Sequence, residues 1–237
     1  MAYRNPNPVV VAVLPGDPQP IRIASYVREL ESIEMAAARV AAEQASVESQ
    51  PSDWSLVTSQ TTPENQVYIF CTMLKMPVSP HAFTLEGLPD PGAPAVNGPT
   101  PVAVGLIRLE GPGEPTLLGV VRGIPPGIGG VALPGGYVDE HETIEEAAAR
   151  ESREECGMLT PDQEWFLVCS RITDQNRVLI FCRYAPQPRQ PGEEVAVRGC
   201  VPYDTREVRA LVPITSTTEL VFPTHQDVAR LYLASQR

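Results

Sequence analysis

Residues 136–158 of this chain read GYVDEHETIEEAAARESREECGM, the most informative stretch of the sequence. It contains three successive alanines (147–149) and no helix breaker, so it predicts a helix over Glu142–Cys156. Thr143 is a residue type that caps a helix N-terminus, with two glutamates following it in the first turn. Gly157 suits the left-handed conformation in which many helices end.

The later turns of this helix carry a cluster of acidic side chains. Glu151, Glu154 and Glu155 stand at positions i, i+3 and i+4, so their carboxylates share one helix face. Three carboxylates so close together repel one another unless a divalent cation lies between them, and hard oxygen ligands suit Mg²⁺ or Mn²⁺. Arg150 can pair with one carboxylate and hold its rotamer. The glycine turn that ends at Gly136 lets a backbone carbonyl approach as a further ligand.

The spacing of the whole stretch resembles the Nudix box. The matching residues are Gly136, then Glu142 after five residues, Arg150 and Glu151 after seven, Glu154 and Glu155 after two, and Gly157 after one. Ser152 departs from the family pattern, which usually has an apolar residue at that position. The aromatic residue often found shortly before the Pro-Gly-Gly turn is also absent. With its flanking strands, the resemblance covers roughly residues 101–237.

The resemblance implies a Mg²⁺- or Mn²⁺-dependent pyrophosphohydrolase. Its substrate would be a nucleoside diphosphate linked to another group, such as an ADP-sugar, a dinucleotide or a nucleoside triphosphate. The carboxylates of Glu151, Glu154 and Glu155 and the carbonyl of Gly136 would hold the metal, which offsets phosphate charge while an activated water attacks phosphorus. The catalytic base lies in the box or in the loop after the second hairpin strand. The residues implied in catalysis are Arg150, Glu151, Glu154, Glu155, Glu193 and Glu194.

Two other functions stay open at this point. A Nudix-like regulatory module would bind a nucleotide without turning it over, and turnover of any nucleotide separates that function from hydrolysis. Isoprenoid diphosphate isomerisation is a third activity of the fold. It requires additional cysteine and glutamate positions that we do not find in this sequence.

The chain contains an internal repeat at an offset of 111 residues. Trp54–Cys71 aligns with Trp165–Cys182 without a gap, and ten of the eighteen columns are identical. At the same offset Tyr26–Glu43 aligns with Tyr137–Glu154, and the pair Val9 and Val10 aligns with Val120 and Val121. We therefore expect a duplicated fold unit over about residues 9–80, the first copy, and 120–191, the second copy.

The alignment predicts that only the second copy is active. Opposite Glu151 and Glu155 the first copy has Val40 and Gln44, and the glycines of the turn are also replaced. A copy that has lost two of three carboxylates is expected to be a degenerate unit without tight metal binding.

Three arginines on expected strands of the second copy are candidates for substrate contact, because each is absent from the first copy. They are Arg122, Arg171 and Arg183, opposite Val11, Gln60 and Thr72. Guanidinium groups suit pyrophosphate recognition through paired hydrogen bonds.

Each copy is expected to contain a strand, a loop, a helix and two further strands. In the second copy we expect strands at Val102–Leu109, Gly119–Arg122 and Glu207–Val212, a hairpin of Trp165–Arg171 and Arg177–Tyr184, and a last helix at Thr224–Ser235. A mixed sheet covered by helices predicts the α+β class, as an α/β/α sandwich of the Nudix type preceded by a truncated, degenerate copy. Seven prolines between residues 77 and 101 divide the chain into a degenerate repeat (1–76), a Pro-rich linker (77–100) and a catalytic domain (101–237).

The composition narrows the choice of partners. A net charge of −11 leaves no basic field for nucleic acid. The five cysteines are scattered, which favours free thiols in a reducing compartment over disulfides or a zinc site. The longest apolar run near the N-terminus, Val9–Leu14, is too short for a signal peptide or a membrane span. We expect a cytoplasmic protein, a monomer or homodimer, that binds neither nucleic acid nor membrane.

Overall fold

The computed structural model describes residues 5–16, 20–74, 83, 85–94, 97–109, 113–186, 202 and 206–236. The strands are β1 (Asn7–Leu14), β2 (Ile21–Tyr26), β3 (Trp54–Thr61), β4 (Gln66–Met73), β5 (Thr100–Leu106), β6 (Arg108–Leu109), β7 (Thr116–Arg122), β8 (Val131–Ala132), β9 (Gly135–Tyr137), β10 (Trp165–Ile172), β11 (Arg177–Tyr184) and β12 (Val208–Ile214). The α-helices are α1 (Ile33–Ala45), α2 (Ile144–Cys156) and α3 (Pro223–Ser235).

These strands form three sheets. Their strand orders are β2-β1-β4-β3, β10-β11-β5-β9 and β12-β7-β6, and β8 pairs with β7. In the first sheet β1 runs parallel to β4 and antiparallel to β2. Mixed sheets accompanied by helices confirm the expected α+β class.

The chain divides into two compact units that do not coincide with the two copies. One unit comprises Met1–Ala103, Tyr137–Ala147 and Leu167–Phe181, and the other comprises Val104–Gly136, Ala148–Phe166 and Cys182–Arg237. The first copy therefore shares a unit with the start of α2 and with most of the β10–β11 hairpin. The division at residues 76 and 101 remains a prediction.

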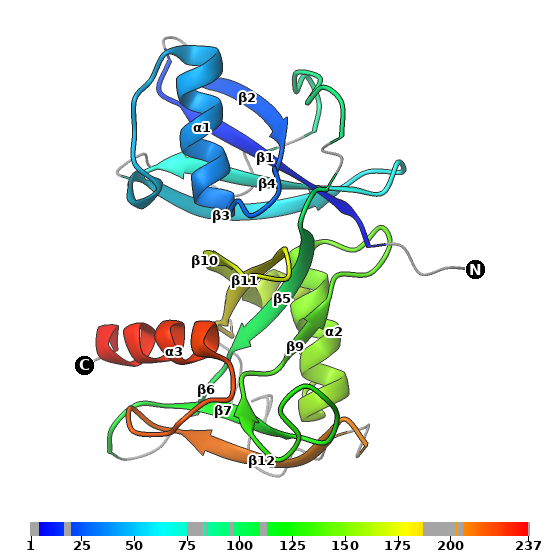
Figure 1. Ribbon diagram of the computed structural model, residues 1–237, viewed down its shortest axis with the longest axis vertical. Coiled ribbons are helices and arrows are strands. Elements are labelled where there is room, and N and C mark those ends of the chain that lie inside the picture. Colours follow the sequence, from blue (N-terminus) through cyan, green and yellow to red (C-terminus); the bar gives the residue numbers. More distant parts are fainter. Residues whose placement is uncertain are drawn as a thin grey trace. The chain divides into compact units, whose positions relative to one another are not determined.

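Both faces of the first sheet are covered. Its central strand β1 is apolar, and its residues from Val9 to Leu14 are almost completely buried. Helix α1 lies on one face (Figure 1). Three side chains of the Pro-rich segment pack against the cluster that contains Val9 and Phe70. They are Phe83, Leu85 and Leu88. The ring centroids of Phe70 and Phe83 lie 5.1 Å apart, so the described part of this segment packs against the sheet.

The backbone hydrogen bonds correct one part of the repeat alignment. The N–H of Asn7 donates to the carbonyl of Asn65, and that of Thr100 donates to the matched carbonyl of Asn176. In the same way the N–H groups of Val27 and Val138, themselves a matched pair, donate to the carbonyls of Pro8 and Pro101. Strand β1 therefore corresponds to β5, at an offset of 93 residues.

The alignment of Val9 and Val10 with Val120 and Val121 is accordingly wrong, since their counterparts are Val102 and Ala103. The valine-rich strands look alike, so identity alone did not distinguish them. The difference between the two offsets, 18 residues, belongs to the segment that contains β6, β7 and β8. The first copy has no such segment, so Val11 is not the counterpart of Arg122.

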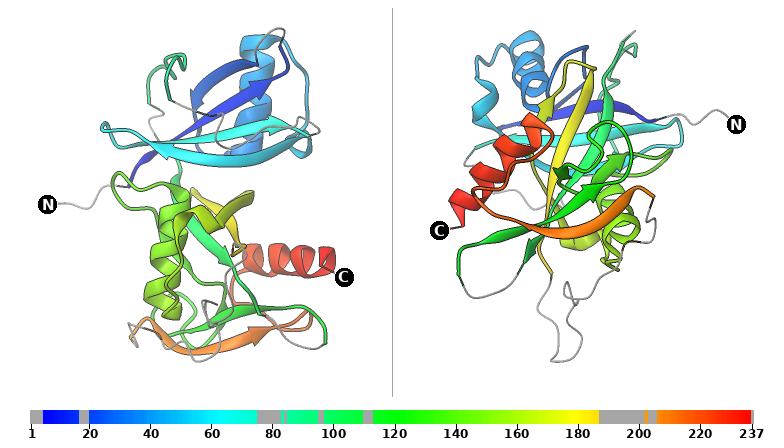
Figure 2. Two further views of the ribbon diagram at one scale, coloured as in Figure 1. Left: turned by 180° about the vertical axis from the view of Figure 1, so that it is seen from behind. Right: turned by 60° about the horizontal axis from the view of Figure 1, so that its bottom comes forward.

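Most of the expected elements are confirmed. The hairpin forms as β10 and β11, and the expected strand at Glu207–Val212 forms as β12. The strand expected over Val102–Leu109 is divided into β5 and β6. Figure 2 shows the chain turning from β12 (orange) into α3 (red), the last helix, which packs against β7. None of the described helices is both long enough and apolar enough to cross a membrane.

Candidate active site

Helix α2 begins and ends as its sequence predicts. The hydroxyl of Thr143 accepts a hydrogen bond from the N–H of Glu146, and the Glu146 carboxylate accepts one from the N–H of Thr143. This reciprocal arrangement is a capping box. At the other end Gly157 has a φ of 69° and its N–H donates to the carbonyl of Arg153. The left-handed cap at Gly157 is confirmed.

The three glutamates of the motif differ in exposure. Glu155 is 8% exposed, and its Oε2 accepts a hydrogen bond of 2.8 Å from the N–H of Gly135. The side chain of Glu151 is 13% exposed and lies 2.6 Å from Nη1 of Arg150. Glu154 is the most accessible, with 48% exposure, and its carboxylate lies 3.4 Å from the same nitrogen. Arg150 thus pairs with two carboxylates, where the sequence predicted one.

Gly136 lies directly against one of these carboxylates. A Cβ built at Gly136 would lie 2.2 Å from Oε1 of Glu151, far closer than any real contact. Only glycine leaves room for the carboxylate beside this backbone. The structure therefore brings Gly136 and Glu151 together, as the resemblance implied.

Electrostatics makes Glu155 an unusual group. Burial, followed by the nearby charge of Glu151, raises the pKa of Glu155 to about 8. The N–H of Gly135 and the charge of Arg122 act in the opposite direction. Ionised Glu155 is thus unfavourable until positive charge arrives beside it.

The residues around Glu151 and Glu155 offer ligands that suit a divalent cation. Within the described ranges, no three His, Cys, Asp or Glu side chains are gathered in a ready-made metal-binding group. The donor chemistry nevertheless fits: two largely buried carboxylates and a carbonyl beside a glycine are hard oxygen ligands for Mg²⁺ or Mn²⁺. The buried carboxylate with the raised pKa is the group that such a cation would stabilise in its ionised form.

The candidate arginines lie in different surroundings. Nε of Arg122 donates to the carbonyl of Pro126 (2.8 Å), and its guanidinium lies 5.1 Å from the ring centroid of Phe222. Arg183 stacks over Phe166 at 4.8 Å. Nη1 of Arg171 donates to a backbone carbonyl. Of the three, only Arg122 is among the charges that act on Glu155.

Two residues of the site were not identified from the sequence. His225 of α3 is 7% exposed, and its Nδ1 accepts a hydrogen bond of 3.3 Å from the N–H of Leu133, just before the glycine turn. Burial lowers the pKa of His225 to about 3, so the imidazole is neutral. Glu207 is among the negative charges that raise the pKa of Glu155. No sequence pattern predicted His225 or Glu207 as a site residue, because both are distant in the sequence from Glu155 and only folding brings them to the site. The predicted Glu193 and Glu194 lie outside the described residues.

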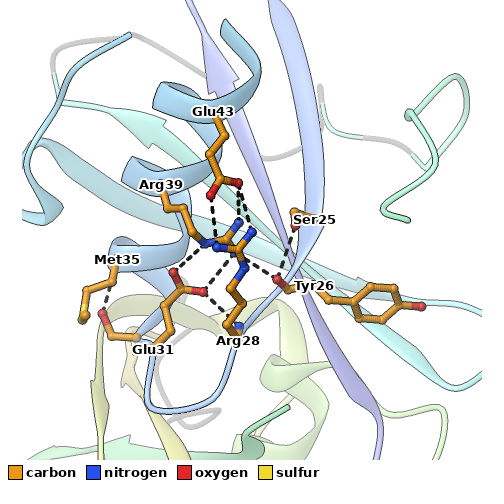
Figure 3. Close-up of polar contacts among 8 residues, drawn as sticks. Ser25, Tyr26, Arg28, Glu31, Met35, Arg39 and Glu43 are labelled. Carbon is orange, nitrogen blue, oxygen red and sulfur yellow. Dashed lines mark hydrogen bonds and ion pairs between the residues drawn. The ribbon is translucent and has the colours of Figure 1, made fainter. Parts of the chain in front are cut away.

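The same positions in the first copy form a closed ion-pair network (Figure 3). Arg39 donates to Glu31 at 2.7 Å, to Glu43 at 3.1 Å and to the carbonyl of Tyr26. Arg28 donates to Glu43 at 3.0 Å. The charges that survive in this copy therefore neutralise one another.

A pocket of about 350 Å³ is lined by the first copy and by residues 85–92 of the Pro-rich segment, and it does not coincide with these acidic residues. Its walls include Tyr26, Gln66, Tyr68 and Leu88. Among the predicted site residues that the structure describes, none lines this pocket.

Comparison with known proteins gives one match by family and several by structure. Residues 99–216 match the family model described as NUDIX domain. A search of the curated proteins finds no match to this sequence. The expected Nudix α+β fold is thereby confirmed for the second copy and its surroundings.

Solved structures of this fold resemble the chain at low identity. A MutT/nudix family protein from Enterococcus faecalis is 20% identical, with a TM-score of 0.41, over 51% of this chain and 45% of that protein. A MutT NUDIX hydrolase from Burkholderia pseudomallei is 22% identical, with a TM-score of 0.41, over 57% and 96%. The NUDIX domain of Shewanella oneidensis NrtR, solved with ADP ribose, is 16% identical, with a TM-score of 0.46, over 68% and 94%. The chain thus spans less than half of the first of these proteins.

Proposed function

Residues 99–216 belong to the Nudix family, and on this premise we propose that the chain is a pyrophosphohydrolase that depends on Mg²⁺ or Mn²⁺. As a Nudix hydrolase the chain acts on phosphoric anhydride bonds. The proposed substrate is a nucleoside diphosphate linked to another group, as in an ADP-sugar, a dinucleotide or a nucleoside triphosphate. The observation that carries the proposal is the buried carboxylate of Glu155, with its raised pKa, beside Glu151 and the glycine turn.

Glu151, Glu154 and Glu155, with the carbonyl of Gly136, would hold the metal. When bound, the cation supplies positive charge that offsets the phosphate oxygens. Arg150 keeps the carboxylates of Glu151 and Glu154 in place through its guanidinium. Glu193 or Glu194 remains our proposed alternative to a box carboxylate as the base that takes the proton of the attacking water.

Phosphate recognition is proposed for Arg122, Arg171 and Arg183. Support is strongest for Arg122, whose charge acts on Glu155 and whose guanidinium is held by Pro126 and Phe222. Arg171 and Arg183 replace the uncharged Gln60 and Thr72 of the first copy.

Incubation with a panel of nucleoside diphosphate derivatives tests this function. We expect release of a nucleoside monophosphate by the unmodified protein with Mg²⁺ or Mn²⁺, and none by the double variant Glu154→Gln, Glu155→Gln. The matched control is Glu43→Gln, which alters the counterpart of Glu154 in the first copy and should leave the rate within about twofold. Tight nucleotide binding without turnover would instead support a regulatory nucleotide-binding module.

A further inference from the structure

The first turn of α2 is held by residues of the first copy. The N–H of Ile144 donates to Oγ of Ser59 at 2.8 Å, and the N–H of Ser59 donates to Oε1 of Glu145 at 3.0 Å. The hydroxyls of Ser59 and Thr58 donate to the same carboxylate. All four residues belong to one compact unit. Strand β3 of the degenerate copy therefore supplies hydrogen-bond partners both to a backbone N–H at the start of the catalytic helix and to the buried carboxylate of Glu145.

The same contacts occur a second time with the copies exchanged. The N–H of Ile33 donates to Oγ of Ser170 at 2.9 Å, and the N–H of Ser170 donates to Oε1 of Glu34 at 2.8 Å. The Ser170 hydroxyl also donates to the Glu34 carboxylate. Each of these three residues stands 111 positions from its partner in the first set.

A second pair of contacts repeats the reciprocity. The N–H of His141 donates to Oδ1 of Asn65 at 3.1 Å, and the N–H of Leu30 donates to Oδ1 of Asn176 at 2.9 Å. When residue i contacts j and the matched j contacts the matched i, the interface is isologous, as between the subunits of a twofold dimer. This arrangement joins two parts of one chain.

Only one half of this symmetric interface leads to the motif glutamates. Helix α2 runs unbroken from Ile144 to Cys156, and Glu151 lies about 9 Å along the axis from Glu145 at 1.5 Å per residue. A shift of the first turn therefore moves the carboxylates of the site. The equivalent helix α1 has Val40 and Gln44 in place of Glu151 and Glu155, so the other half of the interface holds a helix that lacks two of the three metal-binding carboxylates.

We propose that the degenerate copy acts as a built-in second subunit, and that Ser59 and Glu145 are positioning residues for the catalytic helix. This inference rests on the proposed function in one respect, because it assigns the purpose of the positioning to the metal-binding carboxylates. Ser59 touches neither substrate nor metal and acts through Glu145 and the N–H of Ile144.

The symmetry supplies a matched control for the test. Ser59→Ala and Ser170→Ala remove the same hydroxyl from the two halves of one interface, so both should lower the melting temperature by similar amounts. We expect Ser59→Ala to lower kcat about tenfold while KM stays within about twofold, since small displacements of catalytic groups mainly affect the chemical step. Ser170→Ala should leave kcat within about twofold.

A second set of measurements does not depend on nucleotide turnover. Mn²⁺ titration of both variants should show weaker binding only in Ser59→Ala, and hydrogen exchange should accelerate at the amides of residues 151–155 only in that variant. Equal changes in the two variants, or faster exchange confined to the first turn of α2, would overturn the proposal. If the unmodified protein hydrolyses no nucleotide, the proposed function fails while the exchange measurement still decides the positioning.

A milder variant guards against loss of folding. Thr58→Val removes only the hydroxyl that donates to Glu145, and the counterpart of Thr58 is Cys169. We expect Thr58→Val to lower kcat about threefold and Cys169→Val to leave it unchanged. The reverse order of effects would contradict the assignment of the two halves.

Discussion

The two copies share a backbone pattern but differ in charge. The six matched positions are Arg28, Glu31, Arg39, Val40, Glu43 and Gln44 in the first copy, and Asp139, Glu142, Arg150, Glu151, Glu154 and Glu155 in the second. The first set carries two positive and two negative charges, and these four side chains form ion pairs with one another. The second set has one positive residue and five acidic ones. A helix that needs only stability pairs its charges, whereas a helix that keeps unbalanced carboxylates is held for a ligand.

The copies also differ in what covers their sheets. In the second copy the inserted β7 joins β6, β8 and β12 in a further sheet. The first copy lacks that insertion, and Phe83, Leu85 and Leu88 of the Pro-rich segment pack on its sheet instead. The degenerate copy thus keeps its core without the strands that carry Arg122 and support the glycine turn.

The largest effect is expected from making the second copy resemble the first. Glu151→Val with Glu155→Gln installs the residues of the first copy and removes two of the three carboxylates. We expect nucleotide hydrolysis to fall by at least about a thousandfold, because charge neutralisation and water activation are lost together. Steady-state kinetics at saturating Mg²⁺ measures this. The reverse pair, Val40→Glu with Gln44→Glu, should destabilise the first copy without adding activity.

The next prediction concerns the glycine turn. Gly136→Ser installs the residue found at Ser25, and its Cβ would lie 2.2 Å from the Glu151 carboxylate. The carboxylate has to move, and we expect kcat to fall about a hundredfold. Ser25→Gly is the matched control and should leave the rate unchanged. Similar kinetics in Gly136→Ser and the unmodified protein would show that Glu151 is not needed beside this backbone.

The motif predicted α2, its caps and the sharing of one face by three glutamates, because those features depend on spacing along a single helix. The correspondence between β1 and β5 could not be predicted from the sequence, because Val9 is identical to both Val120 and Val102. The backbone hydrogen bonds to Asn65 and Asn176 show that β1 corresponds to β5. His225 and Ser59 could not be found from the sequence, because contacts between distant segments leave no local pattern. Their roles follow from the tertiary structure alone.

A pH effect is expected from helix α3, which follows the second copy and has no counterpart after the first among the described elements. His225 has a pKa lowered to about 3 in the folded protein, against an ordinary value of 6.5. Between these values the imidazole of the unfolded chain binds more protons, so the stability contributed by neutral His225 is complete above about pH 6.5 and falls as the pH drops towards 3. Between pH 7 and pH 5 we expect a loss of about 2 kcal/mol from this group.

Urea denaturation at several pH values measures that slope. His225→Gln keeps an acceptor for the N–H of Leu133 but does not titrate, so the stability of the unmodified protein relative to this variant should fall by about 2 kcal/mol between pH 7 and pH 5. His141→Gln is the control, because the side chain of His141 is half exposed. Parallel pH profiles for His225→Gln and the unmodified protein would assign the acid sensitivity to another group.

The smallest effect concerns the serine that departs from the Nudix pattern. Ser152 is 1% exposed, and its hydroxyl has no hydrogen-bond partner among the residues that the structure describes, whereas the counterpart in the first copy is the fully buried Ala41. A buried hydroxyl without a partner is destabilising, so Ser152→Ala should raise the free energy of unfolding by about 1 kcal/mol. Thermal unfolding compares it with Ala41→Ser, for which we expect the opposite change. Because Ser152 lies on the packed side of α2, kcat should remain within about twofold. A loss of activity in Ser152→Ala would mean that this hydroxyl serves the site, and that the second copy keeps it for function.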